Sequence, residues 1–269
     1  MGLVFGLYKF GRTVPDKKTA ASQAQIPATG AEQQIPAADF DTLLTNAKKN
    51  LSPAKLMQIA QLEHNVVRGD VKDQQIATYR QLAGVWDSLN NLPIAAHYLG
   101  QAAKLENSEK SLTFAANLFL GHLQHTENGS VRKWEANEAN ELLQKAVALN
   151  GDNDSLKVAL ASSYIEGGDV MQGVQQLLAV TSAHPDNAAA NLMLGRLSVT
   201  SGQFDKAVER LNKVLAQQPD NTEALYFLAE AYRGKGETDK AIQLFEKCKQ
   251  LINNPEFSKQ IDDYIKTLK

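Results

Sequence analysis

The chain has little sulfur and no strong excess of charge, and both absences exclude classes of function. Cys248 is the only cysteine among 269 residues, which excludes an internal disulfide and a cysteine-based metal cage and leaves the redox compartment open. The net charge is -2 and the pI is about 6.2. Proteins that bind nucleic acid normally carry a basic face, so we expect no nucleic-acid partner.

The sequence also lacks the residue groups that catalysis requires. Its five histidines are scattered, and no nucleophile stands near a base in a recognisable pattern. His122 and His125 are three residues apart, but no third ligand follows them at helical spacing, and a metal needs three or four. We therefore expect no enzymatic activity, no metal and no cofactor.

A long hydrophobic run is missing as well. Residues 2–10 are apolar, but a helix of that length is only about 15 Å long, against roughly 30 Å of membrane hydrocarbon. No basic region precedes them and no cleavage site follows, so they are not a complete signal peptide. Segment 1–13 is either the remnant of a membrane anchor or a disordered apolar tail, and we favour the anchor.

Segment 14–38 is rich in Ala, Gln, Thr and Pro and poor in large apolar residues. This composition predicts a flexible linker that spans roughly 25 to 30 Å. Lys and Arg after the apolar run favour a cytoplasmic array by the positive-inside rule. The linker composition and the near absence of cysteine are common in bacterial extracytoplasmic proteins. We therefore expect a membrane-tethered, periplasmic protein, with the cytoplasmic side still open.

A regular period organises the rest of the chain. The tripeptide Pro-Asp-Asn occurs at 185–187 and again at 219–221, and Gly168, Gly202 and Gly236 stand at the same 34-residue interval. Each unit has one apolar helical pattern, a turn with glycine, a second apolar helical pattern and a turn with Pro or Asn. The pattern predicts an all-α array of helix-turn-helix units.

The repeated positions resemble the tetratricopeptide repeat, whose signature places Leu-Gly and an aromatic residue on the first helix and Ala, Phe, Ala and Pro on the second. Residues 188–221 supply Leu194-Gly195, Ala207, Leu211 and Pro219. The resemblance implies a right-handed superhelical solenoid of antiparallel helix pairs. The units that fit are 76–109, 110–153 with an insertion, 154–187, 188–221 and 222–255.

The pattern departs from the family in several places. Gly173 stands where Ala is usual, and the extra residues at 124–136 are expected to form a loop. Trp134 in this insertion is either an exposed accessory contact or a cap on the second helix of its own pair, and we favour the cap. Segment 39–75 is predicted to be a degenerate repeat or a cap, and 256–269 a C-terminal capping helix.

The resemblance implies that function is protein binding, in a concave groove lined by the first helices. Relatives that clamp a C-terminal carboxylate use polar donors where this chain has Ala159 and Met193, so such a clamp is not expected. The groove-facing apolar strip suits an apolar peptide or an amphipathic helix; alternatively its residues are half-buried and bind nothing. A structural self-association module is the competing function. The predicted partner-binding residues are Val158, Ser162, Ile165, Leu192, Arg196, Val199, Glu223, Tyr226, Glu230 and Arg233.

Overall fold

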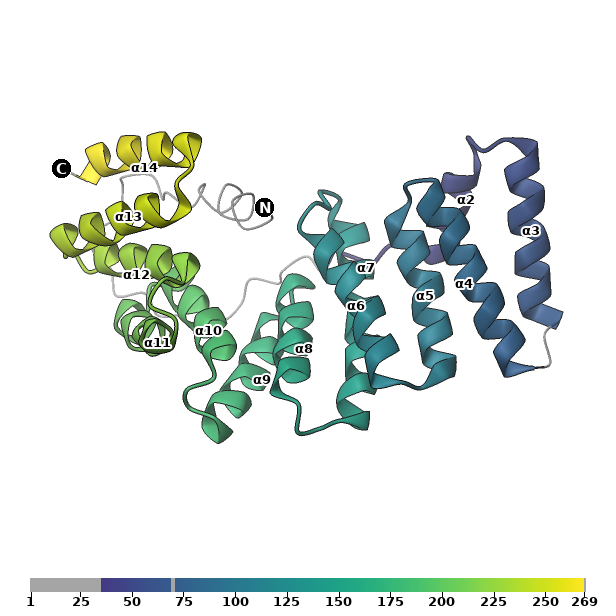
Figure 1. The fold of residues 1–269 in the computed structure, drawn as a ribbon, viewed down its shortest axis with the longest axis horizontal. Coiled ribbons are helices and arrows are strands. Elements are labelled where there is room, and N and C mark those ends of the chain that lie inside the picture. The colour runs from purple at the N-terminus through teal and green to yellow at the C-terminus, as the bar shows by residue number, and fades with distance from the viewer. Residues whose placement is uncertain (1–34, 69–70, 269) are drawn as a thin grey trace.

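The computed structural model describes residues 35–68 and 71–268, and over those residues it contains thirteen helices and no strand. The helices form one elongated, curved row (Figure 1). The predicted all-α solenoid of antiparallel helix pairs is confirmed. The predicted anchor or tail 1–13, and the predicted linker up to residue 34, lie outside the described residues. The helices are α2 (Phe40–Lys48), α3 (Pro53–Arg68), α4 (Lys72–Ser88), α5 (Leu92–Glu106), α6 (Glu109–Leu123), α7 (Gly129–Leu149), α8 (Asp154–Glu166), α9 (Val170–Ala183), α10 (Ala188–Thr200), α11 (Phe204–Gln217), α12 (Thr222–Gly234), α13 (Thr238–Ile252) and α14 (Pro255–Leu268).

Five helix pairs follow one another from α4 to α13, and glycine makes three of the turns inside them. Gly168, Gly202 and Gly236 have φ values of 93°, 72° and 77°. A residue with a Cβ atom is strained in this left-handed conformation, and glycine is not. The 34-residue spacing of these glycines is therefore the spacing of the tight turn between a first and a second helix.

The repeated Pro-Asp-Asn separates one helix pair from the next. Pro185 and Pro219 come directly after His184 and Gln218, the C-cap residues of α9 and α11. The Oδ1 atom of Asn187 accepts the N–H of Ala190 at 3.0 Å, and the Oδ1 atom of Asn221 accepts that of Ala224 at 2.9 Å. Each asparagine thus satisfies an otherwise unpaired amide at the start of a helix. The tripeptide is a helix stop followed by a helix cap.

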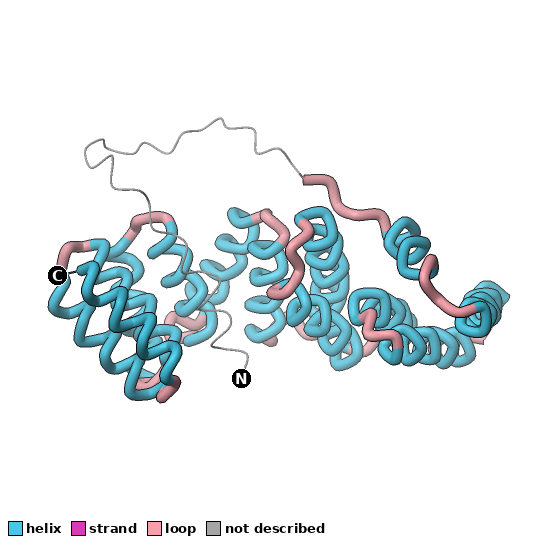
Figure 2. The backbone as a smooth tube through the Cα atoms, turned by 90° about the horizontal axis from the view of Figure 1, so that it is seen from above, coloured by secondary structure: helices cyan, strands magenta, loops and turns pink. Residues whose placement is uncertain are grey.

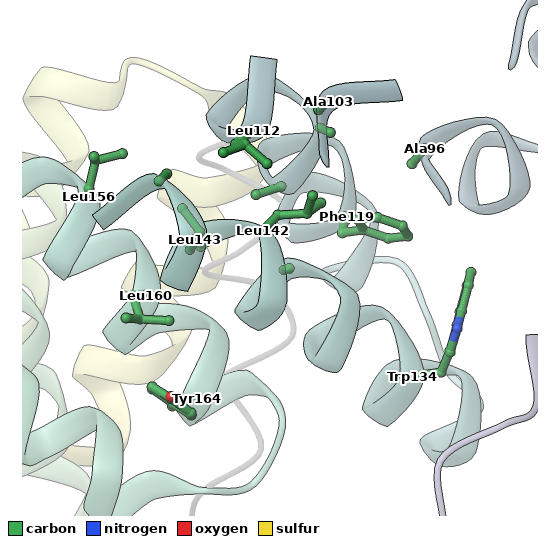
Figure 3. Close-up of a cluster of buried hydrophobic side chains, with 14 residues drawn as sticks. Ala96, Ala103, Leu112, Phe119, Trp134, Leu142, Leu143, Leu156, Leu160 and Tyr164 are labelled. Carbon is green, nitrogen blue, oxygen red and sulfur yellow. The ribbon is translucent and has the colours of Figure 1, made fainter. Parts of the chain in front are cut away.

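The core is a series of clusters stacked along the row. Gly195 lets α10 approach α11 closely, because an added Cβ would lie 2.8 Å from the side chain of Leu211, which is fully buried. The cluster where α6, α7 and α8 meet is drawn in Figure 3. Each cluster combines side chains of neighbouring pairs, so stability depends on stacking. The large side chains of the α6–α8 cluster are Leu112, Phe119, Trp134, Leu142, Leu143, Leu156, Leu160 and Tyr164.

The inserted residues lengthen α7 and do not form the predicted loop. The turn after α6 is only 124–128, and α7 extends over 21 residues. Asn128 starts the helix early, because its side chain accepts the N–H groups of Ser130 at 3.0 Å and Val131 at 3.1 Å. Trp134 is only 5% exposed. The interpretation of Trp134 as an exposed contact is therefore wrong, and the loop prediction is wrong as well.

Segment 39–75 forms a cap and not a helix pair of the repeat type. Helix α3 packs against α4, whereas α2 lies across the row and has no buried residue. Figure 2 shows α2 on one side of the row, reached through an extended segment. The N–H of Ala38 donates to the carbonyl of Ser130 in α7 at 2.9 Å. The C-terminal end of the predicted linker 14–38 therefore contacts the helical array.

The row bends between α9 and α10 (Figure 1). These two helices share a smaller interface than α7 with α8 or α11 with α12. Only five buried residues make up the cluster at this junction, whereas the α6–α8 cluster has fourteen. Cohesion between neighbouring pairs is therefore weakest at this point of the row.

Candidate binding surface

The ten predicted partner-binding residues lie on three first helices, α8, α10 and α12. All ten are half-buried. Helices α8 and α10 lie nearer the inside of the bend than α9 and α11 (Figure 1). The residues therefore share one side of the row, but none of them is fully open to solvent.

The apolar members of this set pack against the core. Val158 and Ile165 contact the cluster formed by α8, α9 and α10. Leu192, Val199 and Tyr226 contact the cluster formed by α10, α11 and α12. The half-buried interpretation is thus correct for their packing, and their part in binding stays a prediction.

The polar members pair with one another. Arg196 lies 3.5 Å from Glu223, which joins α10 to α12, and Arg233 lies 2.8 Å from Glu230 within α12. Burial, reinforced by the charge of Glu230, raises the pKa of Tyr226 to about 12. Burial and the same carboxylate also raise the pKa of Tyr264 in α14. The last repeat and the capping helix therefore share one connected polar cluster.

The sequence prediction missed Phe114, which is 58% exposed on α6. The buried pair Ala115-Ala116 occupies the same place in α6 that Leu194-Gly195 occupies in α10. Phe114 therefore stands in register with Met193, which directly follows the predicted groove residue Leu192 and occupies a place where relatives with a carboxylate clamp carry a polar donor. An exposed phenylalanine on the first-helix side is the most accessible aromatic anchor found there among the described residues.

A second apolar strip lies on the opposite side of the row. Val170, Met171 and Leu178 of α9 are 41%, 72% and 44% exposed. Met171 and Leu178 are seven residues apart and so lie on one face of this second helix, and Val170 adjoins Met171. This α9 strip defines a possible interface that is distinct from the first-helix side.

A hollow of about 540 Å³ lies between α3 and α4. Its lining is rich in amides, including Gln58, Gln61, Asn65 and Gln81. Ligand sites usually combine an apolar wall with a few convergent polar groups. Six of the nine residues that line this hollow are polar, and it is separate from the residues discussed above.

Groups suited to catalysis or metal binding are not found in the part of the chain that the structure describes. It contains no set of three or more His, Cys, Asp or Glu side chains placed to hold a metal. Cys248 is buried, and burial raises the pKa of its thiol to about 12, so the thiol stays protonated at neutral pH. None of the described helices has the length and apolarity needed to cross a bilayer.

The helix pairs agree with a known repeat family. The family model for the tetratricopeptide repeat matches residues 135–197, 175–222 and 198–256. The match covers residues 135–256, which is somewhat less than half of the chain. These repeats include α8 to α13, and thus every residue that the sequence analysis assigned to the groove. Helices α2 to α6 lie outside the matched range, and Phe114 of α6 lies outside it as well.

Solved structures of other repeat proteins share the fold. A thermophilic tetratricopeptide repeat protein of Thermus thermophilus, TTC0263, is 19% identical, with a TM-score of 0.50 over 72% of this chain and 98% of its own. MamA is 21% identical, with a TM-score of 0.49 over 65% of this chain and 91% of its own. YrrB, described as having an unusual peptide-binding site, is 18% identical, with a TM-score of 0.47 over 69% and 91%. No curated protein sequence matches the chain at a significant level.

Proposed function

We propose that this protein is a non-catalytic adaptor that binds an apolar peptide or the apolar face of an amphipathic helix on its first-helix side. The observation that carries this proposal is Phe114, an exposed aromatic residue on the first helix α6, in register with Met193 of α10. Aromatic side chains act as binding anchors because they bury a large area with little loss of conformational freedom.

The half-buried residues beside Phe114 along the row extend this surface. Val158 and Leu192 offer apolar edges on the next two first helices. Tetratricopeptide repeats stack into extended concave surfaces that other proteins use for binding. A partner helix would place side chains at i, i+3, i+4 and i+7 against such a row.

Matched charge substitutions test the proposal by affinity capture with the full chain. Phe114→Glu removes the exposed anchor without touching the buried core, and we expect loss of the captured partner. Met171→Glu makes the same kind of change on α9, outside the groove, and we expect the partner to be retained. Retention of every partner by Phe114→Glu would remove the first-helix side from the proposal.

Self-association is the second candidate function, and the α9 strip supports it. Met171 is the most exposed of its residues, and large apolar residues on one surface often mark an interface. Light scattering of the unmodified chain measures its mass in solution. A dimer that becomes a monomer in Met171→Glu and persists in Phe114→Glu would favour self-association over the adaptor.

We propose in addition that segment 1–13 attaches the array to a membrane and that the array lies in the periplasm of a bacterium. The apolar and aromatic composition of this segment supports the attachment, and the Gln-, Ala- and Pro-rich linker supports the location. A tether would raise the local concentration of partners bound near the same surface. Flotation with lipid vesicles tests the attachment: the full chain should float, and a chain lacking residues 1–13 should not.

A further inference from the structure

Phe40 of α2 is inserted among aromatic side chains of α5 and α7. Its ring stacks on that of His97 with centroids 3.7 Å apart. It also lies 5.9 Å from the ring of Trp134 and meets Tyr98 edge-on at 6.0 Å. We call the surface formed by His97, Tyr98 and Trp134 the aromatic seat. Geometries of this kind stabilise aromatic pairs beyond simple burial of area.

Most contacts that hold the aromatic seat in place come from outside α2, and only Glu63, the partner of Tyr98, is also bound by Lys48 of α2, at 2.8 Å. His97 lies 3.3 Å from the carboxylate of Glu138 in α7, and the hydroxyl of Tyr98 donates to Glu63 of α3 at 3.2 Å. The ring of Trp134 meets that of Phe119 edge-on at 5.6 Å. Figure 3 shows Trp134 at the margin of the cluster, apart from Leu142 and Leu143. The helices that carry these residues belong to the stacked row.

Helix α2, in contrast, is attached loosely. None of its nine residues is buried. Its contacts come from one stripe of half-buried side chains, Phe40, Leu43, Leu44 and Ala47, and from one ion pair, in which Lys48 lies 2.8 Å from Glu63 of α3. Between the described residues of 35–48 and helices α4 to α14, the bond from Ala38 to Ser130 is the single backbone hydrogen bond. A helix this short is not stable alone in water, so α2 forms only while it is in contact with the aromatic seat.

The insertion in the second helix pair, α6 and α7, contacts the N-terminal segment. Ile35 lies against Gly129, where an added Cβ would come within 3.1 Å of its side chain. Ser130 accepts the hydrogen bond from Ala38, and Trp134 receives Phe40. All three receiving residues belong to the stretch by which α7 exceeds the ordinary repeat. The extra turns of α7 thus form part of the surface that residues 35–48 contact.

We propose that the aromatic seat is a docking site for a short amphipathic helix and that residues 35–48 are its removable occupant. The segment leaves as one unit, α2 unfolds when it leaves, and the row of repeats stays folded. The site recognises an aspartate-capped helix that begins with an aromatic residue and continues with a Leu pair, as Asp39, Phe40, Leu43 and Leu44 do. Release exposes the ring of Trp134.

The test uses the full chain with Phe40→Glu, which places a charge in the aromatic seat. We expect acrylamide to quench tryptophan fluorescence at least twofold more strongly in this variant, because Trp134 becomes accessible while Trp86 stays buried. Phe114→Glu is the matched control, since it places the same charge at an exposed phenylalanine away from the seat. Its quenching should equal that of the unmodified chain.

A labelled peptide of residues 35–50 then probes the vacated site directly. We expect it to bind the Phe40→Glu chain at least tenfold more tightly than the unmodified chain, in which α2 competes, and we expect a peptide with Phe40→Glu not to bind. Far-UV circular dichroism during urea unfolding reports on the row. Failure of the peptide to bind, or unfolding of the row in the Phe40→Glu chain, would show that α2 is an integral part of the fold and overturn the proposal.

Discussion

Replacing Gly173 by alanine tests the close approach of α8 and α9, because the residue that is usual at this place in the repeat is expected to destabilise this chain. Alanine is the usual residue at this place in the repeat, and helix propensity alone predicts a gain of about 1 kcal/mol. In the structure, however, the added Cβ would lie 2.5 Å from the side chain of Ile165 and 2.7 Å from the backbone carbonyl oxygen of Ala161. Both atoms belong to α8.

The expected outcome is a net loss of stability. The side chain of Ile165 can rotate away, but the carbonyl oxygen of Ala161 moves only if the backbone of α8 shifts. Overpacking of this kind costs roughly 1 to 3 kcal/mol. Set against the propensity gain, this leaves a loss of up to about 2 kcal/mol for Gly173→Ala.

Urea unfolding followed by far-UV circular dichroism measures the effect. Gly84→Ala is the matched control, because Gly84 also lies inside a helix but an added Cβ there meets no atom within 4 Å. We expect Gly84→Ala to gain about 0.5 to 1 kcal/mol. If Gly173→Ala gained as much as the control, the close approach of α8 and α9 would be refuted.

Three further predictions concern the cap and the buried thiol. Asn221→Ala should lower the free energy of unfolding by about 1 kcal/mol, because the N–H of Ala224 loses its acceptor, whereas Asn221→Asp, which keeps an acceptor oxygen, should lose much less; equal losses in urea unfolding would contradict the cap. Cys248 should not react with a thiol reagent until the chain is unfolded, because it is buried; rapid labelling of the native chain would disprove this. Burial raises the pKa of Cys248 from 9.0 to about 12, so its stabilisation is complete below pH 9 and is lost as the pH rises toward 12. At pH 10 the loss is on the order of 1 kcal/mol, and Cys248→Ala should remove it, as unfolding curves at pH 8 and pH 10 would show.

The repeat itself was predictable because its signals are local. Gly168, Gly202 and Gly236 mark backbone conformations that other residues adopt with strain. Asn187 and Asn221 cap helices within three residues of their own positions. Such signals depend on neighbouring residues of the chain and not on the distant fold, so the sequence displays them directly.

The candidate surfaces were harder to predict because they depend on contacts between distant residues. Phe40 and His97 are 57 positions apart, and only the packed row brings their rings together. Trp134 looked like part of a loop, since the early helix start at Asn128 was not recognised. Phe114 was missed because the groove residues were predicted only from the three regular units between 154 and 255; the small pair Ala115-Ala116 was the signal that would have extended the register to α6.

Site-specific photo-crosslinking tests the central claim that the first-helix side is the binding surface. A photoreactive phenylalanine analogue would replace Phe114 in one chain and Met171 in another, and each chain would be irradiated in its native host. We predict discrete cross-linked adducts to another protein from position 114 and none from position 171. Adducts from position 171 alone, or from neither position, would contradict the account.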